Sequence, residues 1–500
     1  MRKVLRYFYA DSESNGGKPN FGTYLAGDFH QHTTFTDGSW TMGHVMSKNN
    51  EFGLDWWTNS EHGGGFNRDG RTSGTDLEQT IYWDEVEGVA ILGTESYSGG
   101  HQNMWRWQAL RDYSFAALYG QRKLYPNKSI MQGFEWNVPG HEHASVCILG
   151  DQFKRQPNVN ALAEFEFKFD AGDADLIGGV AQGWVKSTNQ GHEKTLEAIS
   201  WLQANHPRTS WVVPAHPERK QLYTIADFRD MNNAGPSVCF GFESMPGHQK
   251  SSNRGGYSSS ADGGGTYGGC GIYAAKIGGL WDAMLSEGRR FWLFASSDFH
   301  DVDGDFYPGE YQKTYTSVKS NNPQSIADGL RSGNSYIVCG DLIRELEFSV
   351  ETAVMGQTYL ASKDYVTVKI KLRNNGLNHF DLVAGEVNGY VAPGDADYNN
   401  ENVSTTKVIA RFDAVGGVTD ANGTVSQKWE ELNNNWVEVS IQVPVNGDMY
   451  FRLRGTNWAL NTSLQTDEME THCWICSKVR TMKPKQKLIF GSILTQYLFL

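Results

Sequence analysis

The chain is poor in cysteine and in positive charge. Its six cysteines are scattered over 500 residues, whereas a domain built on disulfide bonds has a dense cysteine pattern. The chain has 44 lysines and arginines but 57 aspartates and glutamates, which gives a formal net charge of −13. General binding to a nucleic-acid backbone needs a basic surface, so this charge disfavours that class of protein. A local basic pocket for one phosphate stays compatible with it.

Long apolar runs are also missing. The first residues, MRKVLRYFYADSESNGG, are basic but contain no apolar run of the length found in a signal peptide. The apolar end at 488–500 is shorter than the roughly 20 residues that span a bilayer. We therefore expect a soluble protein without a transmembrane segment. Its compartment stays open, because a start site placed too far downstream would hide the signal of a secreted or periplasmic protein.

At 500 residues the chain is long enough for about two domains. After an N-terminal extension (1–23), residues 24–340 alternate buried strands with helical patterns, which predicts an α/β fold with a parallel sheet or barrel. The expected strands, each followed by a loop, lie within 53–62, 129–143, 209–219, 237–248 and 289–301. The expected helices lie within 41–53, 192–207, 278–290 and 322–334.

The character of the sequence changes after about residue 341. Segments such as YVTVKIKLRN and WVEVSIQVPV alternate apolar and polar residues and are separated by turns. This pattern predicts an antiparallel β-sandwich over 342–465, in which we expect no catalytic residue. A Gly- and Ser-rich stretch at 248–271 reads as a long surface loop, either a flexible insertion or a substrate lid.

The last segment, 466–500, does not match the sandwich before it. The alternation stops, lysines become denser, and His472 stands beside the pair Cys473 and Cys476, which resembles half of a zinc site. A shifted reading frame near codon 468 would instead encode a turn and a closing strand. We interpret the segment as an aberrant tail produced by a frameshift, and expect it to be poorly packed and to leave the sandwich without its last strand.

Ligand-type side chains recur where the expected strands end. GDFHQHTTFTDGSW, at 27–40, carries a His-x-His pair, and alternate residues of an extended segment point to the same side. In a β/α barrel the carboxyl ends of the strands converge on one face, and imidazoles with carboxylates suit Zn²⁺, Mn²⁺ or Fe²⁺. The residues that we expect to converge are His30, His32, Asp37, His62, Glu135, one of His141 and His143, His216, Asp298 and His300.

Three alternatives stay open at this site. His141 and His143 compete for one ligand position. Arg219 either binds an anionic oxygen, since its guanidinium matches phosphate, or forms a surface ion pair. Glu243 and His248 are either site residues or structural ones.

These motifs resemble those of the PHP (polymerase and histidinol phosphatase) superfamily. His30-Gln31-His32 with Asp37 is similar to its opening HxH…SDG motif, and Ser60-Glu61-His62 to its TDH motif, with Glu61 in place of the usual Asp. Glu135 is similar to its bridging carboxylate. A histidine in 141–143, His216 in AHP, and Asp298 with His300 in SDFH resemble its later ligands. The resemblance, over about 24–340, implies a distorted (β/α)₇ barrel with two or three divalent ions (Zn, Mn or Fe).

The resemblance implies a phosphoesterase that hydrolyses a phosphate mono- or diester, of a small molecule or a polymer, with a metal-bound hydroxide. Asp37, Glu135 and Arg219 would then be its catalytic residues, and Glu61 would orient His62. Two other hypotheses remain. One is an amidohydrolase-type enzyme acting on a C–N or C–O bond, although such sites often bridge their metals with a modified lysine. The other is a non-catalytic protein that binds the cell envelope or a glycan.

Overall fold

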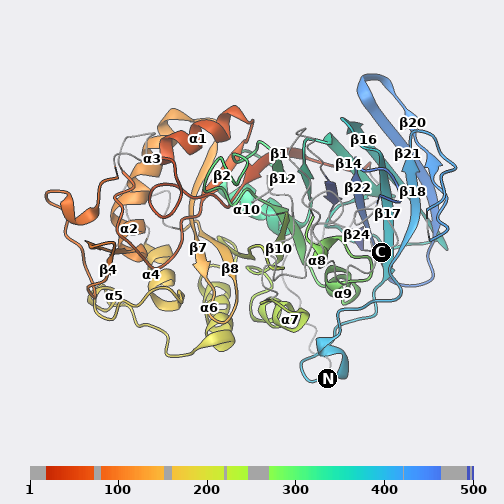
Figure 1. Cartoon of the computed structure of the whole chain (residues 1–500). Helices are drawn as coiled ribbons and strands as arrows, with labels where there is room; N and C mark the ends of the chain where they lie inside the picture. Colours follow the sequence, from red (N-terminus) through yellow and green to blue (C-terminus); the bar gives the residue numbers. More distant parts are fainter. Residues whose placement is uncertain are drawn as a thin grey trace.

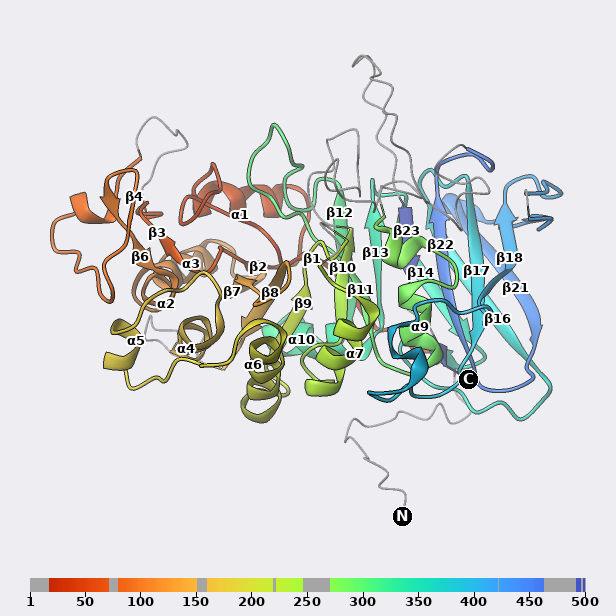
Figure 2. The ribbon, with the colours of Figure 1, turned by 60° about the horizontal axis from the view of Figure 1, so that its bottom comes forward.

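The computed structural model describes residues 18–71, 80–150, 160–218, 222–245, 270–420 and 422–462, together with the backbone of 492–495 and 498–499. Within these residues an α/β half, which reaches to about residue 340, is followed by a β-rich half (Figure 1). The two halves lie side by side, and strands of the first half continue toward the sheets of the second (Figure 2).

The α/β half is organised around a curled sheet. β1 (Thr23–Asp28) is parallel to β2 (Trp56–Asn59), which is parallel to β7 (Ser129–Asn137). β12 (Gln312–Val318) lies on the other side of β1 and runs antiparallel to it. Because β1, β2 and β7 are parallel, their carboxyl ends meet at one edge of the sheet.

The stretch 129–143, which the sequence predicts as one strand and a loop, is a hairpin. β7 is followed by a turn in which Gly140 has a φ of +85°, and β8 (His143–Ile148) returns antiparallel to β7. β9 (Ser210–Pro214) is antiparallel to β8, so it points in the same direction as β7. The hairpin therefore separates His141, in the turn, from His143, at the start of β8.

β10 (Gly241–Met245) and β11 (Trp292–Ala295) form a separate parallel pair. The backbone N–H of Val212 on β9 donates to the carbonyl of Val238 at 2.8 Å, just before β10. The hydroxyl of Thr314 on β12 bonds both the N–H and the carbonyl of Ala295. Within the described residues, the strands are therefore not closed into a ring by a continuous ladder of backbone hydrogen bonds. What the structure shows is a mixed α/β fold.

Helices cover the strands on both sides. In Figure 2, α6 and α7 lie on one side of the row of strands, and α1 lies on the other. The sequence sets some of their ends: Asn322 caps α10 by accepting the N–H of Ser325, Pro323 begins the helix, and Gly333 after it has a φ of +77°. The helices are α1 (Met42–Glu51), α2 (Arg106–Ala109), α3 (Phe115–Leu124), α4 (Asn160–Phe169), α5 (Gly178–Ala181), α6 (Gly191–Asn205), α7 (Ile225–Ala234), α8 (Ile272–Ala275), α9 (Leu280–Ser286) and α10 (Pro323–Ser332).

The β-rich half consists of two mostly antiparallel sheets that share one apolar core, as the alternating pattern predicts. Val366, Val368, Ile370 and Leu372 alternate along one strand and are all buried in that core. One sheet contains β14 (Ile343–Val350), β15 (Ala353–Val354), β16 (Tyr365–Asn374), β20 (Glu430–Glu431) and β21 (Trp436–Pro444). The other contains β17 (His379–Glu386), β18 (Lys407–Asp413), β19 (Gln427–Lys428) and β22 (Met449–Thr456).

Two short strands of the segment expected to be an aberrant tail pair with both halves, and the rest of 466–500 lies outside the described residues. β23 (Ser492–Thr495) lies antiparallel between β22 and β13 (Ser335–Cys339), and β24 (Leu498–Phe499) pairs with β22. The sheet edge at β22 is therefore covered. His472, Cys473 and Cys476 lie outside the described residues.

A buried ion pair joins the two halves. Both oxygens of Asp282 on α9 accept from the guanidinium of Arg452 on β22, at 2.7 and 2.8 Å, and the Asp282 and Arg452 side chains are fully buried. The hydroxyl of Tyr450 also donates to Asp282, at 3.0 Å. The α/β half thus supplies a buried carboxylate whose cationic partner, among the described residues, is Arg452 of the β-rich half. Among the described helices, none combines the length and the apolar character needed to cross a membrane.

Candidate metal centre

The first residues of the site in the sequence, His30 and His32, lie just after the end of β1. His30 and His32 are fully buried, and the backbone N–H of His32 donates to the carbonyl of Phe299 at 2.8 Å. Gln31 also forms a parallel bridge with Phe299. The extended segment after β1 therefore runs along the residues after β11, and this alignment places both histidines beside Asp298.

Glu135, near the end of β7, lies at the centre of five imidazoles. Its Oε1 is 2.7 Å from Nδ1 of His143, 3.1 Å from Nε2 of His30 and 3.2 Å from Nε2 of His216. Its Oε2 is 2.8 Å from Nδ1 of His62 and 3.2 Å from Nε2 of His32. Because each oxygen faces a different set of nitrogens, this carboxylate has the arrangement of a ligand that bridges two ions.

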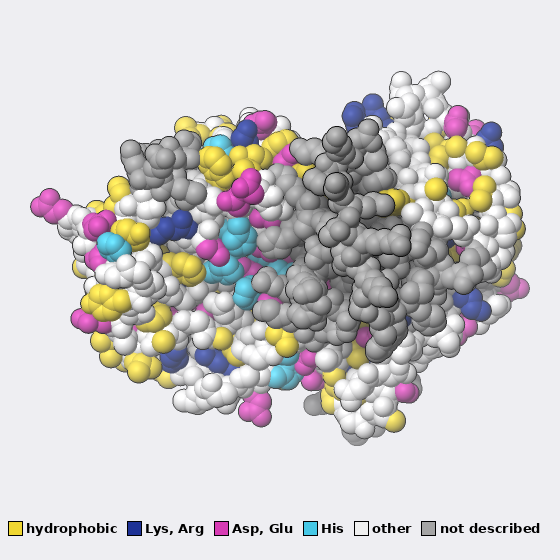
Figure 3. Space-filling view, in the orientation of Figure 1, with side chains coloured by type: hydrophobic (Ala, Val, Ile, Leu, Met, Phe, Trp, Pro, Cys, Tyr) yellow, Lys and Arg dark blue, Asp and Glu magenta, His cyan; other side chains and the backbone are white. Residues whose placement is uncertain are grey.

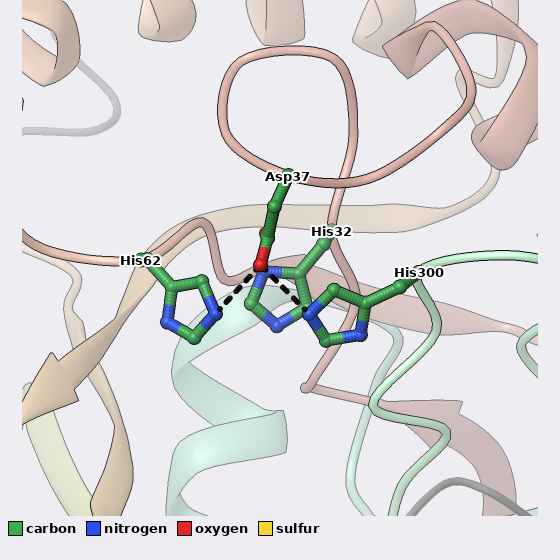
Figure 4. A group of neighbouring side chains, drawn as sticks. All are labelled: His32, Asp37, His62 and His300. Carbon is green, nitrogen blue, oxygen red and sulfur yellow. Dashed lines mark ion pairs between the residues drawn. The ribbon is translucent and has the colours of Figure 1, made fainter. Parts of the chain in front are cut away.

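Asp37 closes a second group on the exposed side (Figure 4). Its Oδ2 is 3.3 Å from Nε2 of His62 and 3.5 Å from Nε2 of His300. The rings of His32 and His300 stack, with centroids 3.9 Å apart. The side chain of Asp37 is 47% exposed, whereas that of Glu135 is 1% exposed. Figure 3 shows histidines gathered with acidic side chains near the middle of the same face. The cluster therefore opens to solvent on the Asp37 side.

Two of the converging residues have a left-handed backbone. His216 has a φ of 33° and Asp298 a φ of 46°, a region that residues other than glycine rarely adopt. In this conformation Oδ1 of Asp298 lies 3.0 Å from Nε2 of His30 and 3.3 Å from Nε2 of His32. Such backbone conformations concentrate at functional sites, because the surrounding structure must hold them in place.

The donor atoms fit metal ions better than they fit one another. Within the described part of the chain, Nε2 of His30, Nε2 of His32 and Oε2 of Glu135 are buried without a hydrogen bond, although each is at contact distance from an atom of opposite polarity. Their lone pairs therefore point at shared space between the side chains. Three groups have ligand atoms that all lie within 4.8 Å of one another: His30, His32, Glu135 and Asp298; His62, Glu135 and His143; and His32, Asp37, His62 and His300.

The electrostatics of the cluster also call for cations. Burial would raise the pKa of Glu135, but the imidazoles of His143, His62 and His30 outweigh it and hold that pKa well below its usual value. Burial would likewise lower the pKa of His300, but Asp37 and Asp298 raise it to about 9. The carboxylates are thus anionic at neutral pH, and buried anions need a positive partner. Bound metal ions would supply that charge in place of protons on the imidazoles.

Buried partners orient the first histidine. Nδ1 of His30 lies 3.0 and 3.1 Å from the two oxygens of Glu243, which also accepts from the hydroxyl of Ser145 at 3.0 Å. Asp28 accepts the backbone N–H groups of His30 and Ser297. Burial raises the pKa of Asp28 to about 7, against the lowering effect of these hydrogen bonds. A carboxylate on the far nitrogen of a ligand histidine fixes its tautomer and its orientation.

The loop that carries Asp37 is held by three charged residues. Glu61 accepts from the hydroxyls of Thr33 and Thr36, and both nitrogens of His62 instead face Asp37 and Glu135. The expectation that Glu61 orients His62 is therefore wrong: Glu61 fixes the loop. Arg106 donates to the carbonyls of Phe35 and His62 at 2.7 Å, and Arg68 donates to those of Thr36 and Gly38.

The structure places the other residues that the sequence analysis named in the cluster, in a different group, or outside the described residues. His143 contacts Glu135, whereas His141 lies in a different group with His192 and Asp227. Glu243 belongs to the surroundings of His30. Arg219 and His248 lie outside the described residues, as does most of the stretch 248–271. Asp28, which the sequence reasoning missed, has a visible signal, because it stands two residues before His30 and shares its parity.

Comparison with known proteins adds a distant structural likeness. No protein-family model matches the chain, and no curated protein matches it either. Among solved structures, the chain is similar to a two-domain protein from Bacteroides vulgatus that contains a predicted PHP-like metal-dependent phosphoesterase. The two are 12% identical with a TM-score of 0.35, over 89% of this chain and 95% of that chain.

Proposed function

We propose that the protein is a metal-dependent phosphoesterase of the PHP type, whose α/β half corresponds to a distorted (β/α)₇ barrel. The observation that carries the proposal is the position of Glu135, with His30, His143 and His216 around one oxygen and His32 and His62 around the other. A single ion does not need five imidazoles around one carboxylate. The arrangement supports a site of two or three ions that share Glu135.

The three groups of neighbouring atoms suggest how the ions would be held. One ion would be bound by His30, His32, Glu135 and Asp298, and a second by Glu135, His143 and His216 or His62. A third would be bound by Asp37, His62 and His300. His62 has one nitrogen near Asp37 and the other near Glu135, so it can serve either the second or the third ion. The site would therefore bind two or three ions at once. Imidazole and carboxylate donors suit Zn²⁺, Mn²⁺ and Fe²⁺.

Several adjacent divalent ions supply two things that phosphoester hydrolysis needs: a water molecule acidified near neutral pH and positive charge beside the phosphate oxygens. The chain's own residues set the access. Asp37 is the exposed acidic residue of the cluster, so a substrate would approach on its side, while the buried Glu135 would keep the ions together. Arg219, which follows β9 and His216 in sequence, stays a predicted phosphate-binding residue.

The bridging position favours a phosphoesterase over the amidohydrolase alternative. Amidohydrolase-type sites often bridge their ions with a modified lysine, whereas in the described residues this position is held by Glu135. A small-molecule or polymeric phosphate mono- or diester would fit this donor set.

The proposal is tested by hydrolysis measured on protein freed of metal with a chelator and then supplied with Mn²⁺ or Zn²⁺. We expect turnover of p-nitrophenyl phosphate or bis(p-nitrophenyl) phosphate only after metal is added. Asp298→Asn and His32→Ala should lower kcat at least 100-fold, because each removes a ligand. His206→Ala, outside the cluster at the end of α6, should leave kcat unchanged.

Two results would separate the alternatives. Turnover of amide, lactone or other C–N and C–O substrates, without turnover of phosphoesters in a panel that includes nucleotides and sugar phosphates, would replace the phosphoesterase by an amidohydrolase-type enzyme. Wild-type metal content and wild-type turnover in both ligand variants would refute the metal centre itself.

A further inference from the structure

A second group of ligand-type side chains lies outside the central cluster. It consists of His141 in the turn between β7 and β8, His192 in the first turn of α6, and Asp227 in the first turn of α7, with ligand atoms all within 4.8 Å of one another. Nε2 of His141 is 2.8 Å from Nδ1 of His192, which is 3.7 Å from Oδ1 of Asp227. Three segments distant in sequence thus present two nitrogens and one oxygen to a common point.

The outer contacts of the two rings fix which nitrogens carry protons. Nδ1 of His141 lies 2.7 Å from the carbonyl of Leu222, which can only accept, so this nitrogen carries the hydrogen. Nε2 of His192 lies 3.3 Å from Oδ2 of Asp230, a carboxylate that also accepts, so this nitrogen carries the hydrogen of the second ring. If both rings are neutral, the two nitrogens that face each other, Nε2 of His141 and Nδ1 of His192, carry no hydrogen and each presents a lone pair.

Two lone pairs 2.8 Å apart repel each other unless a cation lies between them. A third donor is also aimed there. Oδ2 of Asp227 accepts the N–H and the hydroxyl of Thr224 and so caps α7, which leaves Oδ1 directed at His192. We propose that His141, His192 and Asp227 bind a divalent metal ion of the Zn²⁺ class, separate from the ions of the central cluster.

The surroundings of this site match those of metal-binding histidines. Ligand histidines commonly donate their second N–H to a carbonyl or a carboxylate, and here Leu222 and Asp230 are those acceptors. The ring of His141 also stacks on that of Tyr223, with centroids 4.9 Å apart and planes 9° apart, which holds its direction. Two imidazoles and a carboxylate are typical zinc ligands. The side chains of His192 and Asp227 are 30% and 20% exposed, so an ion can enter from solvent.

The contacts behind His192 continue into the β-rich half. Asp230 accepts the hydroxyl of Tyr398 at 2.5 Å through Oδ1, while its Oδ2 faces His192. Arg229, the residue before Asp230 in α7, donates to the carbonyls of Asp397 and Asn400. The ion would therefore join the β7–β8 turn, α6 and α7 at the place where α7 meets the other half. Its role is to fix these elements, and no substrate need contact it.

Zinc content of the full chain tests the proposal. Wild-type protein and the variants His192→Ala and His141→Ala are equilibrated with Zn²⁺, freed of loosely held metal by gel filtration and measured by mass spectrometry of the metal. We expect each variant to hold one zinc per chain fewer than wild type. His206→Ala, at the other end of the same helix as His192, should hold as much as wild type.

A second measurement needs no variant and so does not depend on how a variant folds. Diethyl pyrocarbonate acylates imidazole nitrogens that bind no metal, and peptide mass spectrometry reads each histidine separately. Zn²⁺ should protect His141 and His192 at least fivefold from acylation and leave His206 equally reactive. The central ions are controlled with His32→Ala, in which this protection should persist even if the central cluster loses its metal.

Two outcomes would overturn the site. One is the same zinc content in wild type, His141→Ala and His192→Ala. The other is acylation of both histidines at an unchanged rate with Zn²⁺ present, which would leave a proton shared between the two rings as the explanation of their short contact.

Discussion

Oδ2 of Asp28 accepts a 2.6 Å hydrogen bond from the backbone N–H of Ser297. This contact joins the end of β1 to the residue before Asp298, while Oδ1 of Asp28 accepts the N–H of His30 at 3.0 Å. One buried carboxylate thus fixes the separation between the first histidine and Asp298. The hydroxyl of Ser297 strengthens the same link by donating to the carbonyl of His30 at 2.9 Å.

Replacing Asp28 should loosen the centre without removing a ligand. In Asp28→Asn the amide group turns an N–H₂ toward one of the two backbone donors, which leaves a buried group unsatisfied at a cost of about 1–3 kcal/mol. We expect this loss in the free energy of unfolding, together with a metal affinity at least tenfold weaker by competition with a chelating dye. Asp55→Asn is the control, because Asp55 accepts the N–H of Ala26 on the same strand but lies away from the cluster. Equal metal affinity in Asp28→Asn and Asp55→Asn would contradict the role given to Asp28.

Glu243 should act on metal binding through His30. Removing a partner that orients a ligand histidine typically weakens metal affinity 10- to 100-fold. Glu243→Gln keeps an acceptor for Nδ1 of His30 but loses the charge, so we expect about a tenfold effect, and Glu243→Ala should approach 100-fold. Ser145→Ala removes only the hydroxyl bonded to Glu243 and should have the smallest effect. Metal titrations that place the three variants in another order would show that Glu243 does not position His30.

The pair of Asp282 and Arg452 should contribute strongly to the stability of the joined halves. Removing one member of a buried pair leaves an uncompensated charge and typically costs about 3–5 kcal/mol. We expect Asp282→Asn to lower the free energy of unfolding by about this amount in chemical denaturation. Lys276 and Glu401 form a matched control across the same two halves, since their pair is 3.4 Å long and partly exposed. Glu401→Gln should change stability by less than about 1 kcal/mol.

The pair of Asp282 and Arg452 should also affect the stability of a chain that is truncated at residue 340. Such a chain keeps the whole candidate centre but leaves Asp282 without Arg452 and Tyr450. We expect the shortened chain to be less stable than the full chain. Combining the cut with Asp282→Asn should recover part of the loss. If the shortened chain folds and binds metal but has no chemistry, the expectation that the β-rich half holds no catalytic residue is wrong.

His379 should make the β-rich half sensitive to mild acid. Burial lowers the pKa of His379 to about 4 in the folded chain, whereas a free histidine has a pKa of about 6.5. The unfolded chain therefore binds the proton first, and stability is lost as the pH falls from about 6.5 toward 4, by on the order of 3 kcal/mol in all. Between pH 7 and pH 5, the melting temperature of wild type should fall further than that of His379→Gln. Parallel decreases in the two proteins would exclude His379 as the cause.

The sequence predicts this site well where local geometry decides and poorly where it does not. The alternation of His30 and His32 predicts that both lie on one side of an extended segment, and in the structure both rings contact Glu135 and Asp298. The sequence leaves the choice between His141 and His143 open, because His141 lies in the turn and His143 begins β8, so that the two side chains have different neighbours. The role of Glu243 was also open, since its partner His30 stands 213 positions away and no local pattern connects them.

The fold follows the same division. Each stretch expected to hold a strand does hold one, because alternating or continuous apolar residues encode burial directly. The hairpin of β7 and β8 was missed, since the turn around Gly140 lies inside a segment that reads as one strand. The pairing of β23 and β24 does not follow from the sequence of the tail, because it depends on strand edges supplied by β13 and β22.

The left-handed backbone of His216 and Asp298 bears on the evolutionary history of the chain. Such a conformation typically costs a residue other than glycine about 1 kcal/mol or more, so selection for stability alone would favour glycine at both positions. Selection for what these side chains do in the cluster would keep a histidine and an aspartate there. In a lineage that lost its ions, these two positions should be among the first to drift, and homologues that retain both residues should be the ones in which the centre is still under selection.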